Sequence, residues 1–123
     1  MRVAWNLGLG DAIACAAIVA KFALDNQNKK IQVPCWGRNF VSVKSFFVNY
    51  PNIEIVILEK GEDVFWQIQA DLRLGHYDHN LPKLPTEDFV QWFYRQANFD
   101  MNEKADNRKT ILPQIRSTKF TQL

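Results

Sequence analysis

The residues best placed to do chemistry lie in Asn6–Asp11, a stretch that reads Asn-Leu-Gly-Leu-Gly-Asp between two apolar runs. This order predicts a strand, a glycine turn and a helix. Glycine adopts backbone angles closed to other residues and has no Cβ, so Gly8 and Gly10 could let a ligand approach the backbone. Asp11 stands at the start of the predicted helix. Its carboxylate could cap the helix or face a substrate, and the helical N–H groups could hold an anion.

The glycine turn does not match the common nucleotide-binding motifs. A dinucleotide fingerprint needs a third glycine where Ile13 stands, and a P-loop needs a lysine where Asp11 stands. The third position disfavours a nucleotide-binding oxidoreductase. We therefore expect no cofactor bound by this chain.

Two further loops carry side chains that could contact a sugar or a phosphate. Trp36 and Arg38 stand at the end of the second predicted strand; the alternatives are core packing for the indole and solvation for the guanidinium. Residues 76–79 read His-Tyr-Asp-His, where His76 and Asp78 could contact a sugar or simply belong to a polar loop. We expect no metal site, because this loop lacks a distant third ligand.

Length and composition describe a small globular protein. The chain has 123 residues, 47% of them hydrophobic, and a formal charge of +2, too small to indicate nucleic-acid binding. Cys15 and Cys35 lack metal-ligand spacing, and we expect buried, reduced thiols in a cytoplasmic protein. No signal peptide is recognisable, and the most apolar stretch, 12–24, is broken by Lys21 and too short to be a transmembrane segment.

Alternating strand and helix patterns predict an α/β fold with a Rossmann-like parallel sheet. We expect strands over 2–5, 31–36, 53–58 and 71–74, and helices over 11–25, 39–49, 63–69 and 86–98. Right-handed crossovers give a strand order of about 3-2-1-4, with a ligand site outside the carboxyl ends of the strands. There the segments 6–11, 36–39 and 75–79 should converge.

The predicted domain covers 1–104, and a basic tail or truncated linker follows over 105–123. The first helix is apolar on nearly every side. A helix on one face of a sheet needs only one apolar stripe, so this pattern predicts a missing partner surface, from another domain or subunit. The aromatic residues expected in the core are Trp66, Trp92, Phe93 and Tyr94.

The glycine turn and the helix after it resemble the start of the ADP-heptose:lipopolysaccharide heptosyltransferases, glycosyltransferase family 9. In that family a small-residue turn ends in Gly-Asp, as Gly10 and Asp11 do here, before a Val or Ile and an apolar helix. Val41–Lys44 and Tyr50–Glu54 are also similar to the family's second helix and third strand. The likeness spans about residues 1 to 100.

This resemblance implies one half of a GT-B glycosyltransferase, an enzyme built from two Rossmann-like domains. The N-terminal half holds the sugar or glycan acceptor, and the other half holds the nucleotide sugar. By position Asp11 would be the catalytic base. Together with the candidates named above, the predicted acceptor-binding residues are Asn6, Gly8, Leu9, Gly10, Trp36, Arg38, His76 and Asp78.

Two hypotheses of different classes follow. The first is a glycosyltransferase-like domain that binds the acceptor and is inactive without a second, nucleotide-sugar domain, since the chain ends where the linker to that domain would begin. The second is a non-catalytic binding or assembly module that docks a partner, a second subunit or a second copy, through its apolar first helix.

Overall fold

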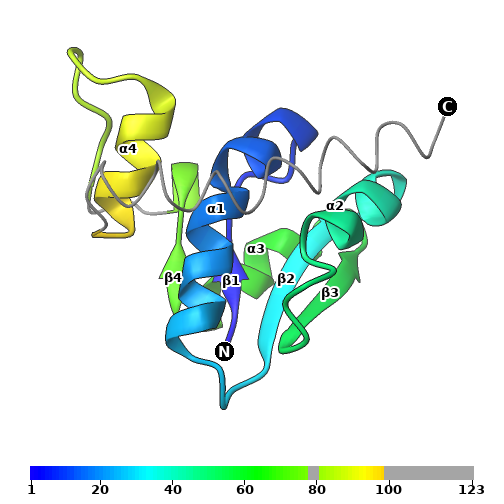
Figure 1. Ribbon diagram of the computed structural model, residues 1–123. Helices are drawn as coiled ribbons and strands as arrows, with labels where there is room; N and C mark the ends of the chain where they lie inside the picture. Colours follow the sequence, from blue (N-terminus) through cyan, green and yellow to red (C-terminus); the bar gives the residue numbers. More distant parts are fainter. Residues whose placement is uncertain (78–80, 99–123) are drawn as a thin grey trace, which may run out of the picture.

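The computed structural model of this chain describes residues 1–77 and 81–98 (Figure 1). The predicted tail, Asp78 and His79 lie outside these ranges. The strands are β1 (Val3–Ala4), β2 (Ile31–Trp36), β3 (Ile53–Leu58) and β4 (Leu72–Arg73). The helices are α1 (Leu9–Asp25), α2 (Phe40–Phe46), α3 (Glu62–Trp66) and α4 (Phe89–Gln96), with the 3-10 turns η1 (Gly37–Asn39), η2 (Gln67–Gln69) and η3 (Gly75–Tyr77).

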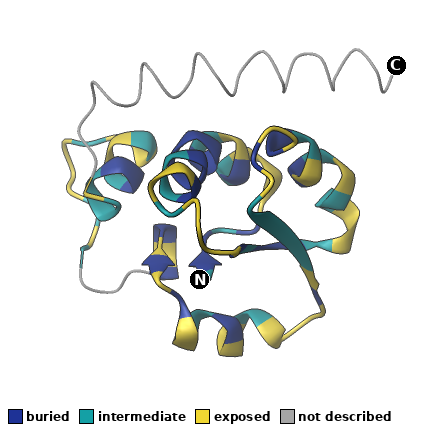
Figure 2. Ribbon diagram, turned by 60° about the horizontal axis from the view of Figure 1, so that its bottom comes forward, coloured by how far each residue is buried: buried dark blue, intermediate teal, exposed yellow. Residues whose placement is uncertain are grey.

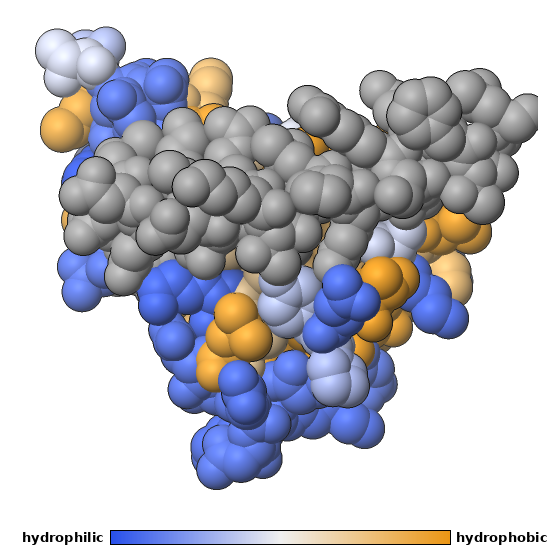
Figure 3. Space-filling view, viewed as in Figure 1, coloured by the Kyte–Doolittle hydropathy of each residue, from blue (hydrophilic) through white to orange (hydrophobic). Residues whose placement is uncertain are grey.

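The fold is mixed α/β, with its helices divided unequally between the two faces of the strands. Figure 2 shows one layer made by α1, α2 and α4 and, on the opposite face, the short α3. Where the front face in Figure 3 is not grey, hydrophilic residues surround small hydrophobic groups. Within the described ranges, no helix has the length and apolar character needed to cross a membrane.

The strands form two short parallel ladders. β2 and β3 pair over their full length, from Ile31 with Ile53 to Trp36 with Leu58. β1 and β4 pair at Val3 with Leu72 and at Ala4 with Arg73. One isolated parallel bridge, between Arg2 and Gln32, joins the first ladder to the second.

Pro34 explains why the pairing of β1 with β2 stops after one bridge. Gln32 N–H donates to Met1 O at 2.8 Å, so every second residue of β2 faces β1, and Pro34 is next in this series. Proline has no N–H to continue the ladder. Two indoles satisfy the carbonyls left at this point: Trp5 Nε1 donates to Pro34 O, and Trp66 Nε1 donates to Val3 O, each at 2.8 Å.

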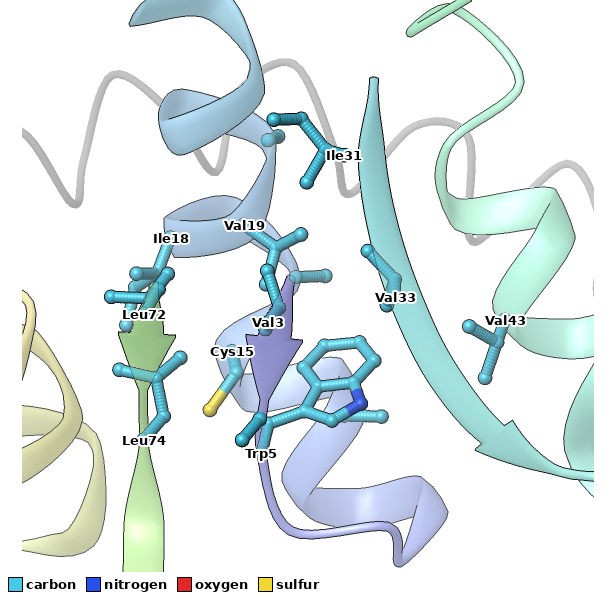
Figure 4. Packing of buried hydrophobic residues seen from close by; sticks show 14 of the residues in the cluster. Val3, Trp5, Cys15, Ile18, Val19, Ile31, Val33, Val43, Leu72 and Leu74 are labelled. Carbon is cyan, nitrogen blue, oxygen red and sulfur yellow. The ribbon is translucent and has the colours of Figure 1, made fainter. Parts of the chain in front are cut away.

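The hydrophobic core lies between α1 and the strands. Figure 4 shows side chains of α1, β1, β2 and β4 pointing toward one another, with the Trp5 ring between β1 and β2. Val3, Ile18 and Ile31 have no exposed surface. Of the aromatic residues predicted for the core, three are buried and Trp92 is half-buried, with its Nε1 donating to Leu81 O at 2.6 Å.

The chain itself supplies the neighbours that the apolar α1 requires. α1 contacts both α2 and α4, and Ala16, Ile18 and Val19 are fully buried. The inference that its all-round apolar pattern needs a missing partner surface is therefore wrong. The pattern arises because strands, α2 and α4 cover different sides of one helix, leaving Ile13 and Leu24 as its most exposed apolar residues.

The predicted elements are all present; β2 and β3 have the predicted bounds, and the other boundaries are shifted. α1 begins at Leu9, before Asp11, because Gly8 is its N-cap. α2 ends at Phe46 instead of 49, where tight turns lead into Tyr50. α4 begins at Phe89 instead of 86, because Asp88 and the third helical residue form a reciprocal capping box.

We predict that Trp66→Phe lowers the free energy of unfolding by about 1–3 kcal/mol, because it leaves the buried Val3 carbonyl without a donor. Urea denaturation measures this change. In a Pro34→Val background, Trp66→Phe should lower the free energy of unfolding by less, because valine restores an N–H that faces Val3 O. An equal loss of unfolding free energy in both backgrounds would contradict the proposed link between Pro34 and the Trp66 indole. Trp36→Phe, at a half-buried indole, is the matched control.

Candidate functional site

The side chain of Asn6 joins two loops that follow β1 and β4. Its Nδ2 donates to Asp11 Oδ2 at 3.3 Å, and its Oδ1 accepts from the backbone N–H of His76 at 3.2 Å. Asn6 and Asp11 are half-buried, whereas His76 is exposed. These bonds bring the glycine turn and η3 together, as expected for the carboxyl ends of neighbouring strands.

The loop after β2 reaches the same turn through a residue that sequence reasoning missed. Asn39 Nδ2 donates to Leu7 O at 3.4 Å, whereas the candidates Trp36 and Arg38 are half-buried and exposed. No motif marks Asn39. The only available signal was a short amide side chain placed just after a strand.

Backbone geometry does not require glycine at the start of α1. Gly8 has φ −67° and ψ 143°, and neither it nor Gly10 has a positive φ, so any residue could adopt these angles. A Cβ at either position would meet no atom within 4 Å. Contrary to the prediction, Gly8 and Gly10 therefore do not adopt angles closed to other residues, although the space beside each of them is open.

Asp11 does not cap α1. Gly8 occupies the N-cap position, α1 has no side-chain cap bond, and Asp11 lies in the first turn with its carboxylate on Asn6. The start of α1 therefore presents backbone N–H groups and two glycines with open space beside them, and the half-buried Asp11 carboxylate lies in the same turn. Such a surface can accept a hydrogen bond from a hydroxyl group through Asp11 and donate bonds from the backbone.

Gly75 is a glycine that the structure does require. Its φ is +68°, and a Cβ there would lie 2.6 Å from Asn6 Nδ2. Gln96 of α4 holds its backbone on both sides: the Gly75 N–H donates to Oε1 at 2.6 Å, and Nε2 donates to Gly75 O at 2.8 Å. Gln96, also missed from the sequence, thereby positions the His76 N–H against Asn6.

Contacts of the Tyr77 side chain hold η3 in place. Its hydroxyl donates to Asp63 Oδ2 at 3.1 Å, and its ring lies 4.0 Å from the His76 ring, centroid to centroid. Burial, followed by the bond to Asp63 and its negative charge, raises the pKa of Tyr77 from 10.0 to about 12. Tyr77 therefore stays a neutral donor at physiological pH.

The cysteines and acidic groups give no sign of metal or thiol chemistry in the described chain. Cys15 and Cys35 are free and buried, and burial raises the pKa of both thiols. The nearby Asp11 carboxylate adds to this effect at Cys15. Among the residues the structure describes, no three His, Cys, Asp or Glu side chains gather to hold a metal ion.

Searches for related proteins return no match among protein-family models, curated proteins or solved structures. Function must therefore be argued from the site itself.

We predict that Gly75→Ala destabilises the fold, whereas Gly10→Ala, inside α1, does not. Alanine at 75 meets a positive φ and the Asn6 amide, and we expect a loss of about 1–3 kcal/mol. Alanine at 10 should stabilise the helix by about 0.5–1 kcal/mol, since it lowers the entropy cost of ordering glycine. Urea denaturation of the two variants tests this. Destabilisation by Gly10→Ala would show that the fold needs this glycine.

We predict that stability falls as pH rises from about 10 through about 12. A group whose pKa is raised by folding stabilises the protein below its unfolded pKa, and Tyr77 loses this contribution as it ionises. Ultraviolet titration of tyrosinate measures the pKa. Asp63→Asn should lower the pKa of Tyr77, because it removes the negative charge. Tyr77→Phe identifies the titrating group, and an unchanged titration curve in Asp63→Asn would contradict the assigned contact.

Proposed function

We propose that this chain is the acceptor-binding half of a nucleotide-sugar-dependent glycosyltransferase, similar to glycosyltransferase family 9. The observation that carries the proposal is the open first turn of α1, where a half-buried carboxylate stands beside two glycines that the backbone does not need. Glycine at Gly10 costs helix stability relative to alanine. Access of a ligand to the backbone would explain why glycine stands at this position despite the lower helix stability.

Asp11 is the proposed catalytic base. The Asn6 side chain donates one hydrogen bond to Asp11 Oδ2 and so orients the carboxylate. The carboxylate oxygens have further lone pairs that can accept the hydrogen of a sugar hydroxyl. In the proposed transfer, the acceptor oxygen bonds to the anomeric carbon as its proton passes to Asp11 and the nucleoside diphosphate leaves. A positioned base contributes about 100- to 10,000-fold in rate.

The proposed architecture is one sheet in the order 3-2-1-4. The Arg2–Gln32 bridge and the Trp5–Pro34 bond support it, because they hold β1 beside β2 across the point where the ladder is interrupted. In this order the site lies between β1 and β4, where the chain reverses direction, the common place for ligands in open α/β sheets.

The neighbouring side chains suit a polyhydroxylated ligand. His76 is exposed beside the Asn6 junction, Trp36 is the last residue of β2, and Arg38 lies in η1 directly after it. We propose that these groups contact the acceptor at its edges. The nucleotide sugar would be held by a separate domain, so that catalysis requires that second half.

We predict that Asp11→Asn weakens acceptor binding at least tenfold, since hydrogen bonds to charged groups contribute about 1.5–3 kcal/mol. The probe is a soluble lipopolysaccharide inner-core oligosaccharide, titrated by calorimetry and by amide NMR. Shifts should centre on the amides of Leu9, Gly10 and His76. Gly10→Ala should also weaken binding, while its unfolding free energy stays equal or rises.

Asp25→Asn is the matched control for charge, because Asp25 pairs with Lys21 at the far end of α1. It should leave binding unchanged. Equal binding by wild type and Asp11→Asn, or no binding of any sugar by the wild type, would overturn the proposed acceptor site.

A further inference from the structure

β3 has a second edge that no described residue pairs with. Ile31 N–H donates to Asn52 O at 2.8 Å, so Asn52 and every second residue after it face β2. Ile53, Ile55 and Ile57 therefore direct their backbone groups outward. The Ile53 N–H already donates to Tyr50 O at 3.0 Å. The outward N–H and C=O groups of Ile55 and Ile57 pair with no strand in the part of the chain that the structure describes.

This edge carries few of the features that usually prevent strand pairing. Such features are short strands, proline, bulges and exposed charges, and β4, with only two residues, is an example of the first. β3 has six residues that read Ile-Glu-Ile-Val-Ile-Leu. Its single charge, Glu54, is paired with Lys30 at 3.1 Å, and Ile57 is 48% exposed.

We propose that β3 pairs in antiparallel fashion with β3 of a second copy of this chain, about a two-fold axis at Ile55. Ile55 then faces its own copy, and Ile53 faces Ile57, so that all outward-directed residues oppose one another. Glu54 faces Val56, which keeps the two carboxylates apart. A register centred on Glu54 would place like charges directly opposite each other.

Space for the side chains of an added strand exists beside β3 on both faces of the sheet. A groove of about 590 Å³ lies between α2 and β3 and includes Phe40, Val48 and Ile55 in its walls. A second groove, of about 420 Å³, lies between β3 and α3 and includes Ile57 and Phe65. The pairing does not depend on the proposed acceptor site, which lies at the other loops.

The first test is the mass of the full chain in solution, by size-exclusion chromatography with light scattering over a range of concentrations. We expect twice the chain mass and a dissociation constant raised at least tenfold by Ile57→Lys. Val64→Lys is the matched control, since Val64 is 55% exposed on α3 and does not line the groove beside β3. A monomeric wild type, or a dimer equally stable in Ile57→Lys, overturns the proposal.

Cysteine cross-linking tests the register without destabilising the edge. Hydrogen-bonded antiparallel residues have Cα atoms about 5.5 Å apart, within the about 4.4–6.8 Å that a disulfide allows. Under mild oxidation Ile55→Cys should form a covalent dimer, and Glu54→Cys should form much less. Stronger cross-linking at position 54 overturns the proposed pairing. Both native cysteines are buried, which limits background reaction.

Discussion

The missing N–H of Pro34 is the constraint on which the arrangement of the strands depends. In a continuous parallel sheet, Pro34 would donate to Val3 O, and its own carbonyl would accept from β1. The chain instead uses the indole N–H groups of Trp66 and Trp5 at these two carbonyls. Because a buried carbonyl without a donor is costly, both indoles are held against β1 and β2. This fixes α3 beneath β1 and the Trp5 ring between the strands.

The proposed site depends on a second chain of contacts, which runs from α4 to the start of α1. Gln96 holds both backbone groups of Gly75, and the adjacent His76 N–H donates to the Asn6 side chain, which in turn donates to Asp11. Each member is supported by the one before it. A substitution in α4 can therefore alter the orientation of a carboxylate far away in the sequence. Positioning of this kind is what a general base needs.

Much of the fold could be predicted because local patterns and burial agree along the chain. The bounds of β2 and β3 were correct, since Ile31–Trp36 and Ile53–Leu58 are apolar runs enclosed by polar turns. Helix starts were less accurate, because the N-cap is set by one backbone angle at Gly8 and by the side chain of Asp88. The missing partner surface was inferred wrongly, since composition cannot show that α2 and α4 both cover α1.

By itself the sequence determined the α/β alternation and the presence of two glycines and Asp11 at the start of the first helix, since these follow from periodicity and residue type. Only the tertiary structure decided which polar groups meet there. Asn39 and Gln96 joined the site although no motif marks them, because they lie 28 and 85 residues from Asp11 in the chain and are brought close by strand pairing and α4 packing. The tertiary structure also shows which glycines the fold needs. Gly75 is required by its positive φ and by the nearby Asn6 side chain, whereas the backbone angles at Gly8 and Gly10 do not require glycine. Hydrogen bonds between distant segments depend on three-dimensional distance, which residue spacing does not encode.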